Sequence, residues 1–195
     1  MLSFNGVASE DEMIAIFLRA ELHSQRFGEQ LRKAIAALGL SVEVLFAPPC
    51  DAAASVARRD IIAVYRGWGK YESVFGGMPD DITWHWVELS EQEIRERVFT
   101  IKWGFEEEFH TRSADKISSA KQQWQKDSIV QLRNTVVEQR VLEPPILLAK
   151  QDLRRLVILE GHSRILSYLV QPELVRFPIT AMVGTSDRMS EWSEW

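Results

Sequence analysis

Residues 155–164, which read Arg155-Leu-Val-Ile-Leu-Glu-Gly-His-Ser-Arg164, decide the expected fold of this chain. The apolar, β-branched run that ends at Leu159 is typical of a short buried strand. Beyond the glycine, apolar residues recur at helical spacing from Ile165 to Leu169. Gly161 stands between the two patterns, where a residue without a Cβ can adopt a positive φ and let another group approach the backbone. The stretch therefore predicts a strand, a tight turn and a helix over residues 162–170.

The start of this helix is a candidate anion site. The first turn of a helix has unpaired N–H groups and the positive end of the helix dipole. His162 and Arg164 add side-chain cations at the same end. A cation there is disfavoured by roughly 0.3–1 kcal/mol unless an anion offsets it, and a bound phosphate or carboxylate would do so. The alternative is that Arg164 pairs with Glu160 or with another carboxylate of the protein.

Size and composition limit the classes of function. The 195 residues are 46% hydrophobic, which suits one compact domain, or a small domain with an appendage, around a sizeable core. A net charge of −5 opposes broad nucleic-acid binding, which depends on many Lys and Arg contacts to phosphate. Cys50 is the only cysteine, so no disulfide or cysteine cluster forms within one chain. With no secretion-type or membrane-spanning apolar run, we expect a cytoplasmic protein with no membrane contact.

The first 80 residues predict a helical region. Two helices are expected over residues 10–39 with Gly39 as the stop, and a third is expected after Asp51 as its N-cap. Residues 65–79 combine four glycines and a proline with aromatic and basic side chains. We interpret this segment as a hinge between residues 1–80 and a second unit, residues 81–195.

Residues 81–195 predict an α+β fold with a small mixed sheet. Strands are expected over 82–89, 98–103, 146–148, 155–159 and 177–183, the third and fourth forming a hairpin. Helices are expected after the capping box Ser90-Glu-Gln-Glu93, over 113–125, 128–140 and 162–170. The tail that carries Trp192 and Trp195 is expected to pack in a core or an interface, or else to stack on a base or ring.

Residues 128–184 resemble the ParB/sulfiredoxin-like superfamily. The matching segments are Ser128-Ile-Val-Gln-Leu132, Val141-Leu-Glu-Pro-Pro-Ile-Leu148, Leu156-Val-Ile-Leu-Glu-Gly-His-Ser-Arg164 and Phe177-Pro-Ile179. In that superfamily a Gly-x-x-Arg turn opens a helix and holds nucleotide phosphates. The turn here is most similar to the Asp-Gly-His-His-Arg motif of the free-serine-kinase branch. Residues 65–71 and 157–164 together also resemble a group of bacterial proteins, a likeness that names no activity.

The resemblance implies a nucleotide site with assigned residues. Gly161 would be the turn glycine, Glu160 would replace the acid of the kinase branch, and His162, Ser163 and Arg164 would contact phosphate. This sequence has no cysteine at 162, which excludes sulfiredoxin chemistry, and it contains nothing similar to the DNA-reading helices of partition proteins.

Phosphoryl transfer also needs a divalent metal and a base near the acceptor hydroxyl. Glu160 and His162 are the catalytic candidates. Mg²⁺ could bind Glu160, Glu107 or Glu108, although a run of three glutamates is more often a solvated surface. Arg112 and Arg66 could complete the pocket, or Arg112 could cap the following helix or stay exposed.

We therefore expect a nucleotide- or phosphate-binding protein that takes ATP, ADP or CTP with Mg²⁺, either as a phosphotransferase or as a phosphohydrolase. The alternatives are a non-enzymatic, nucleotide-regulated interaction module and a ParB-like metal-dependent nuclease. The N-terminal helices or the tryptophan tail are the candidate surface for a protein partner.

Overall fold

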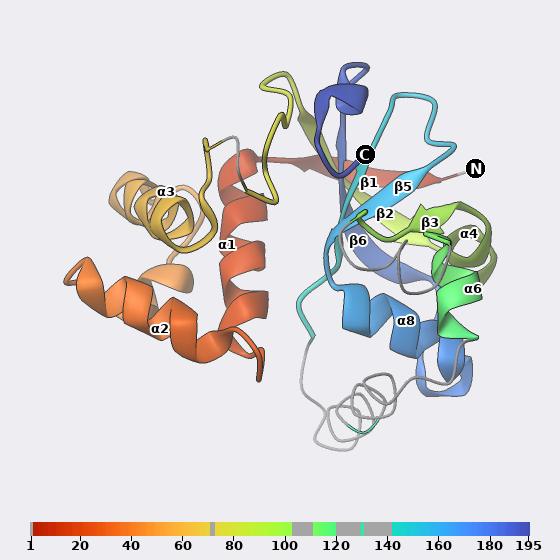
Figure 1. The fold of residues 1–195 in the computed structure, drawn as a ribbon, viewed down its shortest axis with the longest axis horizontal. Coiled ribbons are helices and arrows are strands. Elements are labelled where there is room, and N and C mark those ends of the chain that lie inside the picture. The colour runs from red at the N-terminus through yellow and green to blue at the C-terminus, as the bar shows by residue number, and fades with distance from the viewer. Residues whose placement is uncertain (1, 71–72, 103–110, 120–129, 131–141) are drawn as a thin grey trace.

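One β-sheet lies at the centre of the described structure. The computed structural model describes residues 2–70, 73–102, 111–119, 130 and 142–195. Within these residues six strands form one mixed sheet in the order β1-β2-β6-β4-β5-β3 (Figure 1). The strands are β1 (Ser3–Ala8), β2 (Thr83–Leu89), β3 (Val98–Phe99), β4 (Ile146–Ala149), β5 (Leu156–Glu160) and β6 (Ile179–Thr185). The α+β class expected from the sequence is therefore correct.

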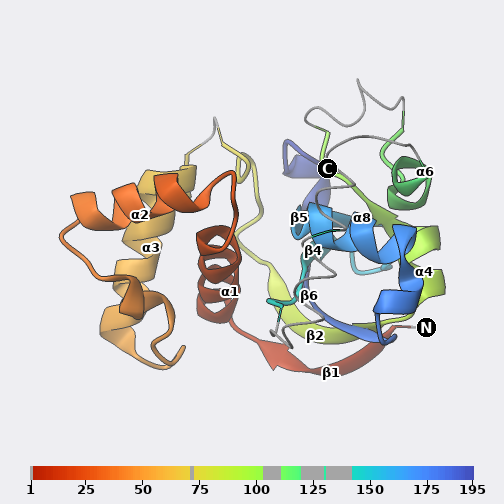
Figure 2. The ribbon, with the colours of Figure 1, turned by 90° about the horizontal axis from the view of Figure 1, so that it is seen from below.

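Two hydrophobic cores lie on opposite faces of this sheet. Alternate residues of a strand point to opposite faces, so Leu148 joins one core and Leu147 the other. Figure 2 shows the helices divided in the same way, with α1, α2 and α3 on one side and α4, α6 and α8 on the other. These helices are α1 (Glu10–Leu22), α2 (Gly28–Ala37), α3 (Ala52–Arg66), α4 (Glu91–Arg97), α6 (Ala114–Ser118) and α8 (His162–Val170). Short 3₁₀ turns occupy η1 (Val42–Leu45), η2 (Pro172–Leu174) and η3 (Met189–Glu191).

The local signals in the sequence placed most helix starts correctly. The Ser90 and Glu93 pair forms the expected capping box at the start of α4. Asp51 caps α3 by accepting a hydrogen bond of 3.0 Å from the backbone N–H of Ala54. Gly39 takes the positive φ of +67° expected just beyond α2.

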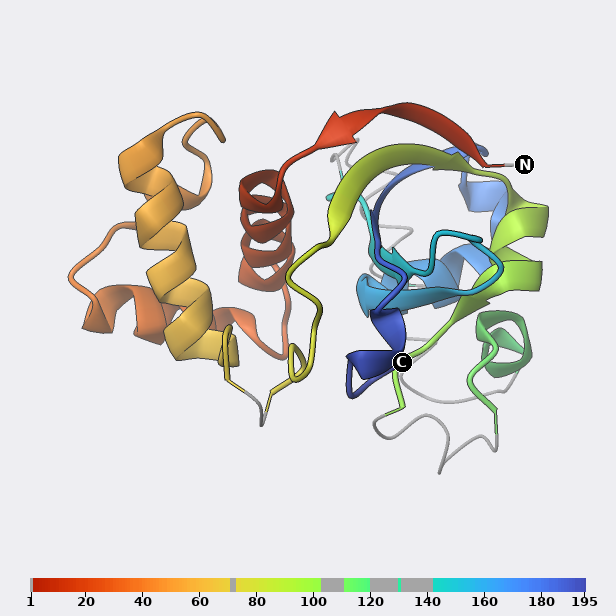
Figure 3. The ribbon, with the colours of Figure 1, turned by 90° about the horizontal axis from the view of Figure 1, so that it is seen from above.

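The boundary expected near residue 80 is crossed by strand β1. Residues 3–8 were expected to belong to a helical region, but they pair antiparallel with β2 and extend the sheet (Figure 3). The core on the α1 side also combines residues from α1 and α3 with residues of β4, β5 and β6. The helical region therefore shares its core with the sheet, and the N-terminal part is not purely helical.

The aromatic loop interpreted as a hinge is bound by the C-terminal tail of the chain. Trp192 is buried, and its indole N–H donates to the carbonyl of Val74 at 2.7 Å. The N–H of Ser193 donates to the carbonyl of Gly76 at 2.8 Å. The expectation that Trp192 packs in the core is confirmed, and its ring is not exposed to a partner.

Two strands differ in length or position from the expectation. The strand expected at 98–103 is the two-residue β3, which pairs with β5. β6 begins at Ile179 rather than Phe177, because Pro178 has no N–H to donate to a strand ladder. The β4–β5 hairpin is antiparallel as expected. The helix expected at 128–140 lies outside the described residues apart from Val130, and of the one expected at 113–125 only α6 is described.

None of the described helices combines the length and the apolar character that a bilayer crossing needs.

Candidate functional site

The turn between β5 and α8 has the backbone that the sequence predicted. Gly161 has a φ of +101° and a ψ of +19° and precedes the first residue of α8. Its carbonyl accepts the first helical hydrogen bond, 2.9 Å from the N–H of Ile165. No side chain caps this helix start, and its first turn contains no acidic residue. Ser163 is exposed there. The positive end of the α8 dipole is therefore not neutralised by a local carboxylate in that turn.

Arg164 pairs with Glu160 across this turn, which is the alternative that the sequence left open. One guanidinium nitrogen donates to the Glu160 carboxylate and another to the backbone carbonyl of Glu143. The two side chains are 15% and 16% exposed, so the pair is largely shielded from water. Arg164 is thus available to an outside anion only if the anion replaces Glu160 as its partner.

The carboxyl group of Glu160 has an environment that favours its neutral form. Burial raises its pKa, and the nearby Glu21 carboxylate raises it further, whereas Arg164 and Arg66 lower it. The net direction is upward. Loss of a proton from Glu160 is therefore harder here than in water.

Arg66 belongs to a second ion pair beside the first. It donates to Glu21 at 2.6 Å, and its guanidinium lies 4.0 Å from the centre of the Phe27 ring. The hydroxyl of Tyr65 donates to the same carboxylate. Arg66 is close enough to Glu160 to lower the pKa of its carboxyl group, but it is already paired with Glu21. A ligand contact of Arg66 stays a prediction.

A third pair links the helical region to the segment before β4. Nε and Nη2 of Arg19 donate to the two carboxylate oxygens of Glu143, at 2.7 and 3.0 Å. Sequence reasoning missed Arg19, Glu21 and Glu143. No local pattern marks these residues, because their partners lie tens of residues away along the chain.

His162 is held as a neutral imidazole. Burial lowers its pKa to about 3, and the positive charge of Arg164 contributes in the same direction. The N–H of Ile101 points to its Nε2 at 3.5 Å. The side chain therefore supplies a hydrogen-bonding group near the turn rather than a permanent cation, which corrects the expectation of two cations there.

The lowered pKa of His162 predicts that acid destabilises the folded state. The unfolded chain binds a proton to this histidine near pH 6.5, whereas the folded chain does so only near pH 3. Between these values the unfolded state holds more protons, so the stability falls as the pH decreases. Because His162 as a residue is not completely buried, we expect it to account for about 2 kcal/mol of the loss between about pH 7 and about pH 4. Urea unfolding of the wild type and of His162→Gln at both pH values measures this loss of stability. An equal loss of stability in the two proteins would contradict the prediction.

Arg112 forms hydrogen bonds with the C-terminal tail and with the segment after β3. Its Nε donates to the carbonyl of Thr100 and its Nη1 to the carbonyl of Trp195, both at 3.0 Å. Arg112 is only 9% exposed, so the alternative that it stays exposed is wrong. These contacts join the tail to the segment after β3, and a ligand contact of Arg112 stays a prediction.

The metal site expected at Glu107 and Glu108 lies outside the described residues. Across residues 2–70, 73–102, 111–119, 130 and 142–195, no group of three His, Cys, Asp or Glu side chains is placed to hold a metal ion. The carboxylate of Glu160 is engaged by Arg164. A Mg²⁺ contact of Glu160 therefore stays a prediction.

Comparison with known proteins adds no family assignment: no protein-family model, no curated protein and no solved structure matches this chain.

Proposed function

We propose that the protein binds a phosphate-bearing ligand, a nucleotide such as ATP, ADP or CTP, at the start of α8. The observation that carries the proposal is the uncapped first turn of α8 beside a guanidinium whose carboxylate partner has a raised pKa. A phosphate would accept hydrogen bonds from the N–H groups of the first turn and would interact favourably with the helix dipole. The Gly-x-x-Arg turn and its resemblance to the ParB/sulfiredoxin-like superfamily support the same assignment.

Binding in this proposal is an exchange of anions on Arg164. The ligand phosphate replaces the Glu160 carboxylate on the guanidinium, which suits bidentate phosphate contacts. Glu160, left without its cation, takes up a proton because its pKa is already raised. His162 and Ser163 lie beside the phosphate as neutral hydrogen-bonding groups. Transfer of the phosphoryl group is the finer proposal, in which Mg²⁺ would neutralise the phosphate charge.

A thermal-shift screen tests binding. ATP, ADP, CTP and GTP are compared with and without Mg²⁺, since a ligand that binds the folded state raises its melting temperature by mass action. Inorganic phosphate is the minimal probe. A screen in which no nucleotide and no phosphate raises the melting temperature would contradict the proposal.

Placing a carboxylate at the helix start locates the site. Ser163→Glu puts a negative side chain in the first turn of α8, so the free protein should become more stable by about 0.3–1 kcal/mol. The same carboxylate repels the ligand phosphate, so the ligand-induced rise in melting temperature should disappear. Ser163→Gln is the matched control, since it adds the same bulk without charge. Unchanged ligand binding in Ser163→Glu would place the site elsewhere.

Turnover is tested separately from binding. Glu160→Gln keeps a hydrogen-bonding partner for Arg164 and removes the charge. If the wild type releases phosphate from a nucleotide, and this variant binds the nucleotide but does not turn it over, Glu160 acts in catalysis. A wild type that binds without turnover would instead favour the interaction module.

A further inference from the structure

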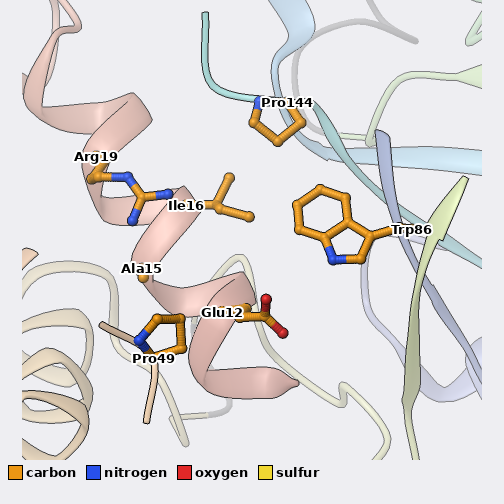
Figure 4. Close-up of a pocket in the computed structure, with 7 residues that line it drawn as sticks. All are labelled: Glu12, Ala15, Ile16, Arg19, Pro49, Trp86 and Pro144. Carbon is orange, nitrogen blue, oxygen red and sulfur yellow. The ribbon is translucent and has the colours of Figure 1, made fainter. Parts of the chain in front are cut away.

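A cleft separate from the 160–164 turn lies between α1 and the sheet. It has a volume of about 140 Å³ and is lined by residues of α1, β2 and two proline-containing segments. The lining residues are Glu12, Ala15, Ile16, Arg19, Pro49, Trp86 and Pro144. Figure 4 shows Ile16 facing the indole of Trp86 across the opening, with Pro144 at one end and Pro49 at the other.

The two charged residues of this cleft differ in whether they have an ion-pair partner. Arg19 already has the Glu143 carboxylate on two nitrogens, and its third donates to the carbonyl of Leu45. Glu12 accepts one hydrogen bond, 2.8 Å from the backbone N–H of Ser9, and no cation among the described residues pairs with it. The group in the cleft that lacks a counter-charge is therefore the carboxylate.

The surroundings of Glu12 add to this negative charge. The first turn of α1 carries Glu10, Asp11 and Glu12, and its first two carboxylates share the single guanidinium of Arg59. The positive end of the helix dipole, about half an elementary charge, offsets only part of the excess. The cleft is therefore electrostatically complementary to a cation.

The remaining walls are apolar and suit a hydrocarbon chain. Ile16, Pro49 and Pro144 offer aliphatic carbon, and Trp86 offers an aromatic ring, a group that attracts ammonium ions through its π face. Long ammonium side chains bury their methylene groups along such surfaces while the charged end stays hydrogen-bonded. A primary ammonium also has three N–H donors for the carboxylate oxygens.

We propose that this cleft binds a primary alkylammonium group, with the ammonium on Glu12 and the alkyl chain against Ile16, Trp86 and the two prolines. The inference does not depend on the anion site, because the two sites share no residue and have opposite charge preference.

The test is a titration of the protein with n-butylammonium chloride, followed by the ¹H–¹⁵N signal of the Trp86 indole. Trp86→Phe assigns that signal among the seven tryptophans. We expect a saturable shift in the wild type. Butan-1-ol, which has the same chain without the charge, should give none. Equal binding of the alcohol, or no saturable shift with the amine, would overturn the proposal.

Glu12→Gln is the decisive variant, because glutamine can replace glutamate in a capping box and the helix start is retained. Affinity for n-butylammonium should fall by about tenfold, the difference between a charged and a neutral hydrogen-bond acceptor. Glu93→Gln removes the same charge from the equivalent capping box of α4 and should leave the affinity unchanged. An equal loss in both variants would mean non-specific attraction and would overturn the proposal.

A second ligand identifies the source of the ammonium group. Nα-acetyl-lysine amide presents the same end group on a peptide backbone. Binding at least as tight as that of n-butylammonium assigns the cleft to a lysine side chain of a partner, and weaker binding assigns it to a free amine.

Discussion

Replacement of Arg58 by methionine is expected to lower the free energy of unfolding by about 4 kcal/mol. The Arg58 side chain is completely buried on α3. Its Nη1 donates to the carbonyls of Val44 and Ala47, at 3.1 and 2.9 Å, and its Nη2 donates to Ser55 Oγ at 3.2 Å. Methionine keeps the aliphatic stem but removes the donors from two part-buried carbonyls and from the buried Ser55 Oγ, and each unsatisfied acceptor costs about 1–3 kcal/mol. Because η1 lies against α3 through these bonds, its packing should loosen as well.

The neighbouring arginine provides the control. Arg59 is 41% exposed and pairs with the carboxylates of Glu10 and Asp11. Exposed ion pairs contribute about 0–1 kcal/mol, so Arg59→Met should have a small effect. Urea unfolding measures both variants, with the midpoint compared at a constant denaturant slope. Similar losses in the two variants would show that the backbone contacts of Arg58 contribute little.

Replacement of Gly161 by alanine is expected to cost about 3 kcal/mol and to displace the start of α8. The φ of +101° is unfavourable for any residue with a Cβ. An added Cβ would lie 2.9 Å from the Cβ of Pro145, which belongs to a rigid ring, and 3.2 Å from a guanidinium nitrogen of Arg164. The variant therefore disturbs both the fold and the Arg164–Glu160 pair.

Gly39→Ala is the control that separates the free-energy cost of a positive φ from the cost of the steric contact with Pro145. Gly39 has a φ of +67°, and an added Cβ would meet no atom within 4 Å. Its replacement should therefore cost only about 1 kcal/mol. Thermal or urea unfolding of the two variants gives the difference. If Gly161→Ala were no more destabilising than Gly39→Ala, the close approach of Pro145 would have no energetic weight.

The structural features that were predicted correctly from the sequence depend on local signals. Capping by Asp51 and by Ser90, and the positive φ of Gly161, depend on residues within a few positions of one another. The β4–β5 hairpin likewise follows from two apolar runs separated by a short polar turn. Such signals act before distant segments meet, so they can be predicted from one segment alone.

The missed features depend on distant partners. Strand β1 has no alternating pattern, and it is a strand because β2 offers it an edge of backbone groups to pair with. The tail is anchored because Trp192 joins the core that also contains residues of α1. The pairing of Arg164 was foreseen only as an alternative, since Glu160 lies four residues before it.

The amino-acid sequence by itself determined the α+β class, most helix starts and the bend at Gly161, because hydrophobic period, capping and backbone freedom act within a few residues. The tertiary structure alone decided which charges meet. It paired Arg19 with Glu143 and Arg66 with Glu21, and left Glu12 without a cation among the described residues. The physical reason is that an ion pair depends on distance in space, which packing of the helical region against the sheet sets and spacing along the chain does not.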